Sequence, residues 1–280
     1  MSYMLTFLCN VWQPVKTILH YRIYGTGPRV VLAFHGYGQS EGHWRSIAAV
    51  LGDRATIYSF DLFYHGNSRL AKADAPLTKT RLAELLEQFL TEKGIDQFSL
   101  LAFSMGAKFA LTAVERFPGR VEKIWLIAPD GLQRQFWYSL ATYPPWMRGV
   151  LGRAVLRPQR LLRFLNVLGE RRVVDTNLIR FAEWQLESRE KRLRVYRSWV
   201  GFRLLVFDLK SLARILNEHK VEVSFFLGKY DRVIPHAGLQ RFIGSLQRAR
   251  TILLDTGHAG LIYDVAAYLR RHPEVITPTS

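Results

Sequence analysis

Cysteine is nearly absent from this chain of 280 residues, which contains only Cys9. A disulfide within the chain and a zinc site built from cysteines are therefore excluded, and we expect a reducing compartment. Long apolar runs are also missing, because no segment reaches the ~18 uninterrupted apolar residues that a membrane-spanning helix needs. Residues 1–10 lack the basic start and the small-residue cleavage site of a secretion signal, so we expect a cytoplasmic protein.

Acidic residues are scarce relative to basic ones, with 23 Asp and Glu against 39 Lys and Arg and a net charge of +16. Most of this excess lies in residues 134–215, which hold 17 basic and 6 acidic residues. Such an uneven distribution indicates a distinct basic module and not a uniformly basic nucleic-acid binder. The sequence also lacks helix-turn-helix, zinc-finger and aromatic-platform signatures, so we expect no nucleic-acid partner.

Short, nearly continuous apolar runs alternate along the chain with longer segments of helical spacing. Runs of this kind are typical of strands covered on both faces, as in a parallel sheet. The predicted strands are residues 29–34, 55–60, 98–103, 123–128, 221–227 and 250–254. The predicted helices between them are residues 80–93, 104–117, 238–246 and 260–271. The sequence therefore predicts an α/β fold with a doubly wound, mostly parallel sheet, preceded by a strand pair within residues 15–24.

The alternation of strands and helices stops between residues 130 and 217. This stretch has no convincing strand and is rich in arginine, leucine and tryptophan. We interpret residues 130–217 as a helical insertion that follows a core strand, and residues 1–129 together with 218–280 as the α/β core.

Ser104 stands where an apolar run breaks into small residues, between Ala102 and Gly106. This pattern resembles the G-x-S-x-G turn, in which a nucleophilic serine sits at a strained corner between a strand and a helix. Ala102 replaces the first glycine and adds only one methyl group. The alternative is a serine that serves as the N-cap of the helix that follows the strand.

Two further residues suit catalysis by a serine hydroxyl, which needs a base and a group that orients the base. His258 follows the last predicted strand and lies between glycines, and Asp231 follows the strand before it. Because the carboxyl ends of parallel strands meet at one edge of the sheet, we expect both near Ser104. The alternatives are an ordinary histidine and an aspartate that caps the turn before Pro235. The order Ser104, Asp231, His258 fits this fold.

The loop His35-Gly36-Tyr37-Gly38 follows the first core strand. Its glycines permit a tight turn that can direct the Tyr37 N–H toward a reacting carbonyl, with the Met105 N–H as a second donor. The alternative is a structural turn rich in glycine. This chemistry requires neither a metal nor a cofactor, so we expect none.

These motifs together resemble the α/β-hydrolase superfamily, of the capped, single-domain, esterase-like serine hydrolase type. The resemblance extends from about residue 15 to 271 and rests on residues 35–38, 61–68, 102–106, 228–235 and 257–258. It implies that residues 130–217 form a helical cap over the active site, and that Asp61 and His65 are structural residues. A serine at position 104 speaks against haloalkane dehalogenase and epoxide hydrolase activity, because those relatives use an aspartate there.

The sequence thus predicts a serine hydrolase that cleaves a carboxylic ester or thioester with an apolar acyl or alkyl part. One alternative is hydrolysis of a carbon–carbon bond in a diketone, or a related lyase reaction, with the same three residues. Another alternative is a ligand sensor that retains these residues and signals through its cap.

Residues 188–199 concentrate basic side chains in the predicted cap, namely Arg189, Lys191, Arg192, Arg194 and Arg197. Three interpretations remain open for them. They form a solvated helix face, a docking surface for an acidic partner such as an acyl carrier protein, or a surface that adsorbs to anionic lipid. The cap tryptophans suit either packing within the cap or an apolar acyl pocket, and these are Trp137, Trp146, Trp184 and Trp199.

Overall fold

The computed structural model describes residues 16–133, 136–159, 162–163, 166–167 and 183–275. Its centre is a seven-stranded sheet with the order β1-β3-β2-β4-β5-β6-β7. Strand β1 is antiparallel to its neighbour β3, and every other neighbouring pair is parallel. The strands are β1 (Tyr21–Tyr24), β2 (Arg29–Phe34), β3 (Ala55–Phe60), β4 (Phe98–Phe103), β5 (Val121–Ile127), β6 (Glu222–Gly228) and β7 (Ala249–Leu254).

The predicted strands are confirmed, three of them with the predicted bounds and three shifted by one or two residues. Their continuous apolar character has the expected cause, since all six residues of β4 are buried between helices on both faces. The prediction of a strand pair within residues 15–24 is wrong. The described part of that segment contains only β1, which pairs with β3, a strand that follows much later in the sequence.

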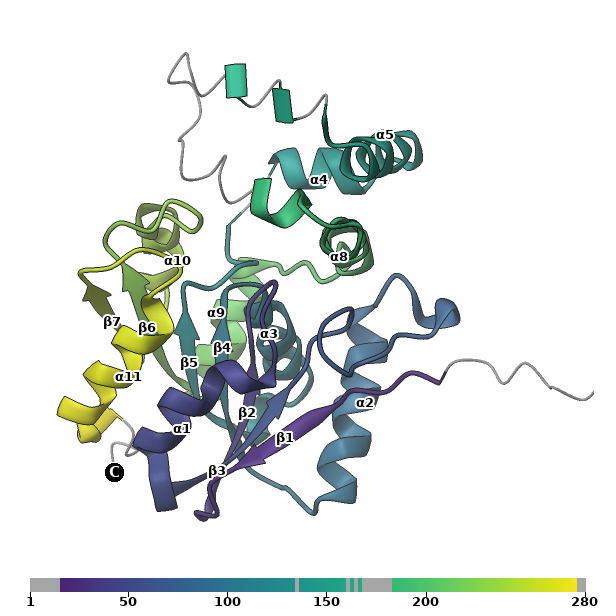
Figure 1. The fold of residues 1–280 in the computed structure, drawn as a ribbon. Coiled ribbons are helices and arrows are strands. Elements are labelled where there is room, and N and C mark those ends of the chain that lie inside the picture. Colours follow the sequence, from purple (N-terminus) through teal and green to yellow (C-terminus); the bar gives the residue numbers. More distant parts are fainter. Residues whose placement is uncertain (1–15, 134–135, 160–161, 164–165, 168–182, 276–280) are drawn as a thin grey trace, which may run out of the picture.

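Helices cover both faces of the sheet, as the predicted doubly wound fold requires (Figure 1). On one face α1 (Arg45–Leu51) packs against α11 (Leu261–Arg271). On the other face α3 (Ala107–Arg116) contacts both α2 (Lys79–Glu92) and α9 (Leu209–Glu218). The short helices are α10 (Gln240–Ile243) and the 3-10 turns Glu41–Trp44, Gly52–Arg54, Lys72–Asp74, Ser104–Gly106, Pro118–Arg120, His236–Leu239 and Pro273–Val275.

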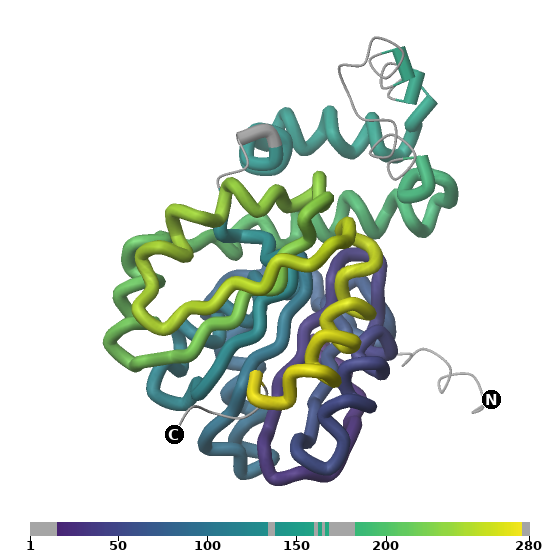
Figure 2. Tube along the Cα trace, turned by 90° about the vertical axis from the view of Figure 1, so that its left-hand side faces the viewer, coloured from purple at the N-terminus to yellow at the C-terminus, as the bar shows by residue number. Residues whose placement is uncertain are grey.

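Three helices that connect β5 to β6 lie beyond the carboxyl ends of the strands (Figures 1 and 2). They are α4 (Phe136–Thr142), α5 (Pro145–Leu156) and α8 (Arg189–Gly201). Local sequence explains where two of them begin, because Pro145 occupies the first turn of α5 and the Ser188 side chain accepts the Lys191 N–H at the start of α8. The described residues of this connection form no strand.

Helix α9 also lies within the predicted insertion but packs on the sheet. The Asp208 side chain begins it by accepting the N–H groups of Lys210 and Ser211. Leu212 and Leu216 then join the main hydrophobic core. The last part of the connection between β5 and β6 therefore belongs with the core layers.

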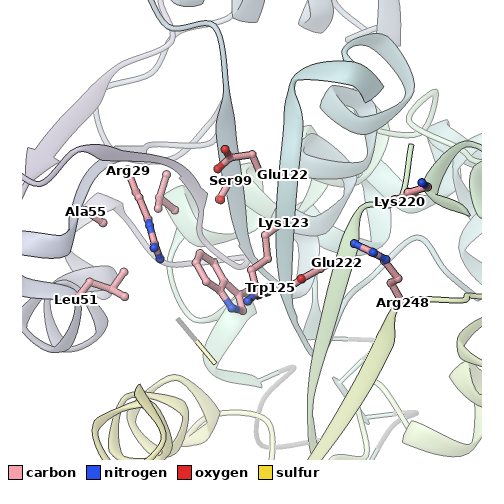
Figure 3. A pocket seen from close by; sticks show the side chains of 11 residues that line it. Arg29, Leu51, Ala55, Ser99, Glu122, Lys123, Trp125, Lys220, Glu222 and Arg248 are labelled. Atoms are coloured by element: carbon pink, nitrogen blue, oxygen red, sulfur yellow. Dashed lines mark ion pairs between the residues drawn. The ribbon is translucent and has the colours of Figure 1, made fainter. Parts of the chain in front are cut away.

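A cavity of about 170 Å³ lies at the opposite, amino-terminal end of the strands (Figure 3). Its wall includes Arg29, Trp125 and the buried ion pair in which Lys123 Nζ lies 3.1 Å from Glu222 Oε2. Arg29, Lys123 and Glu222 lie in the first half of β2, β5 and β6, whereas Ser104 follows the last residue of β4, so the cavity is distinct from the Ser104 corner. None of the described helices is long and apolar enough to cross a bilayer.

Candidate active site

Ser104 occupies a sharp corner between β4 and α3. Its φ is +48°, in the left-handed region that a residue other than glycine rarely adopts. Gly106 makes the corner possible, because a Cβ atom there would lie 2.1 Å from the carbonyl oxygen of Phe34. Ala102 is fully buried and pairs in register with Phe34, so the sheet accommodates its methyl group. The Asp130 N–H, in the loop after β5, donates to the Ser104 carbonyl over 3.0 Å and helps to hold the corner.

Substitution of Gly106 tests the packing of this corner. We expect Gly106→Ala to lower the free energy of unfolding by about 3 kcal/mol, because the added methyl group overlaps rigid backbone of β2. Urea denaturation measures the loss. Gly42→Ala is the matched control, since the nearest atom to a Cβ at Gly42 is 3.8 Å away. Equal stability of the two variants would contradict this description of the corner.

Asp231, His258 and Ser104 form a continuous row of hydrogen-bonding groups. His258 Nδ1 lies 2.6 Å from Asp231 Oδ2, and His258 Nε2 lies 3.2 Å from Ser104 Oγ. The Asp231 carboxylate is buried, and its Oδ1 accepts the N–H groups of Val233 and Ile234, both at 2.8 Å. A carboxylate fixed in this way favours the His258 tautomer with the proton on Nδ1, which leaves Nε2 free to accept from Ser104.

The loop that contains Tyr37 presents one backbone donor between two that are already used. The Gly36 N–H donates to Gln39 Oε1 and the Gly38 N–H donates to His65 Nε2, each over 2.9 Å. Within the described residues, no acceptor is found for the Tyr37 N–H. The Met105 N–H lies in the first helical turn after β4, where backbone N–H groups have no carbonyl partner within the helix. Among the described residues the Tyr37 N–H thus has no backbone acceptor, and the Met105 N–H lies in the first turn after β4.

Two buried histidines brace this loop, and both accept from a backbone N–H. His35 Nε2 accepts from Leu62 over 3.0 Å, while His35 Nδ1 lies 2.7 Å from the Gly36 carbonyl. His65 Nε2 accepts from Gly38, as described above. Burial lowers the pKa of His35 well below its ordinary value and lowers the pKa of His65 to about 4. Both rings are therefore neutral at pH 7, which their acceptor role requires.

Asp61 holds the neighbouring segment in place through its carboxylate. Oδ1 accepts the Glu41 N–H over 2.9 Å and Oδ2 accepts the Asn67 N–H over 2.8 Å. Gly66 lies directly against this carboxylate and has a φ of +48°. These contacts fit the structural role that the resemblance implied for Asp61 and His65.

The neutral histidines predict a loss of stability in acid. The pKa of His65 is about 4 in the folded protein and near 6.5 in the unfolded chain, so only the unfolded chain binds a proton between these values. As the pH falls from 6.5 to 4, His65 alone removes about 3 kcal/mol of stability. NMR titration of the His65 ring together with urea denaturation across this range measures the effect. A His65 ring that titrates near pH 6.5 would contradict it.

Sequence reasoning missed a buried charged group beside the corner. Lys108 Nζ lies 3.2 Å from Asp130 Oδ2 and 4.6 Å from the ring centre of Tyr138 in α4. Burial opposes the charge of Lys108, but Asp130 and Tyr138 more than offset it and raise the pKa of Lys108. The available signal was a lysine within the apolar run of α3, whose residues 107–114 are all buried. This pair links the corner to the first helix of the insertion.

The insertion contacts the Tyr37 loop through apolar side chains. Tyr37 packs against a small cluster formed by Val155 of α5, Val195 of α8 and Leu186. Burial raises the pKa of the Tyr37 hydroxyl, so the phenol is neutral. An apolar surface thus faces the loop that presents the free N–H group.

The tryptophans of the insertion do not share one environment. Trp146 and Trp184 are 67% and 53% exposed, so neither side chain is buried in the cap. Trp184 packs within the cap against Lys191, whose Nζ lies 4.3 Å from the centre of the indole ring. Trp199 packs against Tyr138, with ring centres 5.6 Å apart. The side chain of Trp137 lies outside the described residues, as does Cys9.

The basic residues of α8 are partly neutralised by local contacts. Lys191 pairs with Glu187 at 2.6 Å and Arg194 pairs with Glu190 at 2.8 Å. Arg192 donates to backbone carbonyls at the start of the helix. Arg189 and Arg197 are exposed. Among the described residues, no three His, Cys, Asp or Glu side chains gather closely enough to hold a metal ion.

A mostly parallel sheet with a strained serine at the end of a central strand, covered by helices on both faces, defines the class of α/β hydrolases. A family model described as the alpha/beta hydrolase fold matches residues 29–265, and the chain belongs to this family. The predicted superfamily and fold are thereby confirmed.

The sequence identity to individual proteins is below 30% in the examples that follow. A pimeloyl-[acyl-carrier protein] methyl ester esterase of Nitrosomonas europaea is 23% identical over 259 residues, which cover 86% of this chain and 92% of that protein. An uncharacterized protein of Mycobacterium tuberculosis is 27% identical over 151 residues, 53% of this chain and only 42% of that protein. The structure of a thermophilic esterase from Thermogutta terrifontis superposes with a TM-score of 0.68 at 17% identity, covering 95% of this chain and 100% of the esterase. That likeness shows the shared fold.

Proposed function

We propose that this chain is a serine hydrolase that cleaves a carboxylic ester or a thioester with an apolar acyl or alkyl part. The observation that carries the proposal is the row of Asp231, His258 and Ser104, with successive distances of 2.6 and 3.2 Å. In this assignment Ser104 is the nucleophile, His258 the general base and Asp231 the group that orients the imidazole.

In the first half-reaction, Ser104 Oγ attacks the carbonyl carbon of the ester while His258 Nε2 accepts the hydroxyl proton. The carbonyl oxygen becomes an oxyanion and accepts the N–H groups of Tyr37 and Met105. Each donor of this kind contributes about 3 kcal/mol to the stability of the transition state. The carbon–oxygen or carbon–sulfur bond of the leaving group then breaks, and His258 returns the proton to the departing alcohol or thiol.

In the second half-reaction, water attacks the acyl group that is now bonded to Ser104. His258 Nε2 accepts a proton from this water and passes it to Ser104 Oγ as the acyl–enzyme bond breaks. The products are the free carboxylic acid and the original enzyme. Asp231 stays ionised throughout and stabilises the imidazolium that forms twice in the cycle.

In this proposal, helices α4, α5 and α8 form the helical cap that we predicted within residues 130–217, and they cover the active site. The apolar contacts of Tyr37 with Val155, Leu186 and Val195 support an apolar acyl or alkyl group in the substrate. Since Leu212 and Leu216 belong to the main core, the cap in this proposal ends before α9.

The substrate is proposed to be a small ester, either free or presented by a partner at the basic cap. The name of the Nitrosomonas relative describes an ester attached to an acyl carrier protein, which supports an acidic carrier protein as one such partner. Charge supports both this partner and an anionic lipid surface, because the cap region holds most of the excess positive charge.

Turnover of a short p-nitrophenyl ester, a matched thioester and a vinylogous diketone tests the reaction class. We expect the ester and the thioester to be hydrolysed at rates that depend on Ser104, and the diketone to be a poor substrate. Preference for the diketone would move the assignment to carbon–carbon bond hydrolysis. Negligible turnover of all three, with ligand-dependent protection of α4 and α8 in hydrogen exchange, would identify a ligand sensor instead.

A further inference from the structure

The solvent face of α5 combines apolar and basic side chains and has no carboxylate. Trp146 is 67% exposed, and Val150 and Leu156 are each 45% exposed. Arg153 and the C-cap residue Arg157 are also exposed. Trp146, Val150, Arg153 and Arg157 follow one another at spacings of four, three and four residues, so they form one stripe along the helix.

The opposite face of α5 is already occupied. Val155 is buried in the cluster with Leu186 and Val195. A Cβ atom at Gly152 would lie 3.2 Å from the Tyr196 ring, which shows how closely α5 approaches α8. The exposed stripe is therefore a second apolar surface and not the packing face of the helix.

Helix α5 lies farther from the sheet than α8 does. Figures 1 and 2 show α8 above the carboxyl ends of the strands and α5 above α8. The sequence of α5 contains no Asp or Glu. The carboxylates of Glu187 and Glu190 belong to the start of α8 and to the residues before it, and both are paired with basic side chains. A flat anionic surface could thus approach α5 without meeting a like charge on that helix.

We propose that the exposed stripe of α5, together with the neighbouring Leu156, adsorbs to an anionic lipid bilayer, with Trp146, Val150 and Leu156 in the interfacial region and Arg153 and Arg157 at the headgroups. A helix with tryptophan and aliphatic residues on the same face as arginines suits this interface, because arginine stems lie along apolar surface while their charged ends reach the phosphates. A protein partner recognised by charge alone would not require three exposed apolar side chains beside the arginines.

Adsorption of α5 would place the proposed active site beside a source of apolar esters. Only this consequence rests on the proposed ester hydrolysis. The adsorption itself does not involve Ser104, Asp231 or His258, so the two proposals can fail separately.

Vesicle flotation of the full chain tests the adsorption, with phosphatidylcholine alone and with phosphatidylcholine mixed with phosphatidylglycerol. We expect roughly tenfold stronger binding to the anionic vesicles, and release as the ionic strength rises. Trp146→Ser, and separately Arg153→Gln combined with Arg157→Gln, should each weaken binding by roughly tenfold. Vesicles that contain brominated lipid should quench less tryptophan emission in Trp146→Ser than in the unaltered chain.

Matched control variants change exposed residues of the α/β core, outside α4, α5 and α8. Tyr263 of α11 is 68% exposed, nearly as Trp146 is, so Tyr263→Ser should leave vesicle binding unchanged. Arg241→Gln combined with Arg270→Gln removes the same charge from exposed core positions and should have little effect. Equal binding to neutral and anionic vesicles, or equal losses in the cap and core variants, would overturn the proposal. Binding of an acidic carrier protein to α5 without vesicle binding would also overturn it.

The same variants separate this proposal from the proposed function. Trp146→Ser should hydrolyse a soluble p-nitrophenyl ester at the rate of the unaltered chain, whereas Ser104→Ala should bind vesicles normally. Vesicle binding that is absent while Ser104-dependent hydrolysis persists refutes the adsorption alone. Hydrolysis that survives Ser104→Ala refutes the proposed function alone.

Discussion

Replacement of Ser104 by alanine should lower kcat for a soluble ester by at least about 10⁴-fold, because it removes the atom that forms the acyl–enzyme bond. The Tyr37 and Met105 donors would remain, so a small residual rate above that in water is expected. The fold should be retained, since Ser104→Ala removes one hydroxyl and keeps the Cβ atom at the strained corner. Initial rates with a p-nitrophenyl ester, together with a urea unfolding curve, measure both quantities.

The matched control for this variant is Ser224→Ala. Ser224 is also a buried serine of the sheet, and within the described residues its hydroxyl has no hydrogen-bond partner. Loss of that hydroxyl should leave kcat unchanged. A Ser104→Ala enzyme that keeps more than a tenth of the original kcat would remove Ser104 from the mechanism.

Replacement of Asp231 by asparagine should lower kcat by about 10⁴-fold while substrate binding changes little. Asp231 Oδ1 accepts two backbone N–H groups, so the asparagine oxygen would take that position and its NH₂ group would face His258 Nδ1. His258 would then carry its proton on Nε2 and could no longer accept from Ser104. Measurement of kcat and KM separately, from pH 6 to pH 9, distinguishes this effect from a loss of binding.

Asp255→Asn is the matched control for the charge change. Asp255 is three residues before His258, but its side chain is 75% exposed and pairs with Lys229 on the surface. We expect this variant to keep the original kcat. A similar loss of kcat in both variants would show that the general negative charge of this edge, and not the orientation of His258, is what matters.

Much of the fold follows from the sequence because the strands are buried on both faces. A strand such as β4, in which five of the six residues are apolar, can be predicted without knowledge of its partner strands. The candidate site follows from topology, since residues after three parallel strands must meet at one edge. The structure indeed brings Ser104, Asp231 and His258 within hydrogen-bonding distance.

What the sequence could not supply depends on contacts between distant segments. The antiparallel pairing of β1 with β3 is one such contact, because the turn after β1 does not determine which strand it meets. The ion pair of Lys108 with Asp130 joins residues from α3 and from the loop after β5. The position of α9 is another case, since an amphipathic helix has the same pattern whether it covers a sheet or another helix.

The exposure of Trp146 also could not be predicted from the sequence. Trp146 lies in the first turn of α5, and Val155 and Leu151 on the other side of this helix form its packing face. The apolar character of Trp146 alone does not indicate which of the two sides is packed. Helix α5 approaches α8 closely at Gly152, where a Cβ atom would lie 3.2 Å from the Tyr196 ring. Only the assembled helices show that Trp146 faces outward.

Reaction with a fluorophosphonate, followed by mass spectrometry of the digested protein, tests most directly whether Ser104 is an activated nucleophile. We expect a single adduct on the peptide that contains Ser104, no adduct in Ser104→Ala, and much slower labelling in His258→Gln. Competition by a panel of esters would then rank substrates by how strongly they protect Ser104. An adduct on a different serine would contradict the assignment of Ser104 as the nucleophile. Labelling that is unchanged in His258→Gln would contradict the assignment of His258 as its general base.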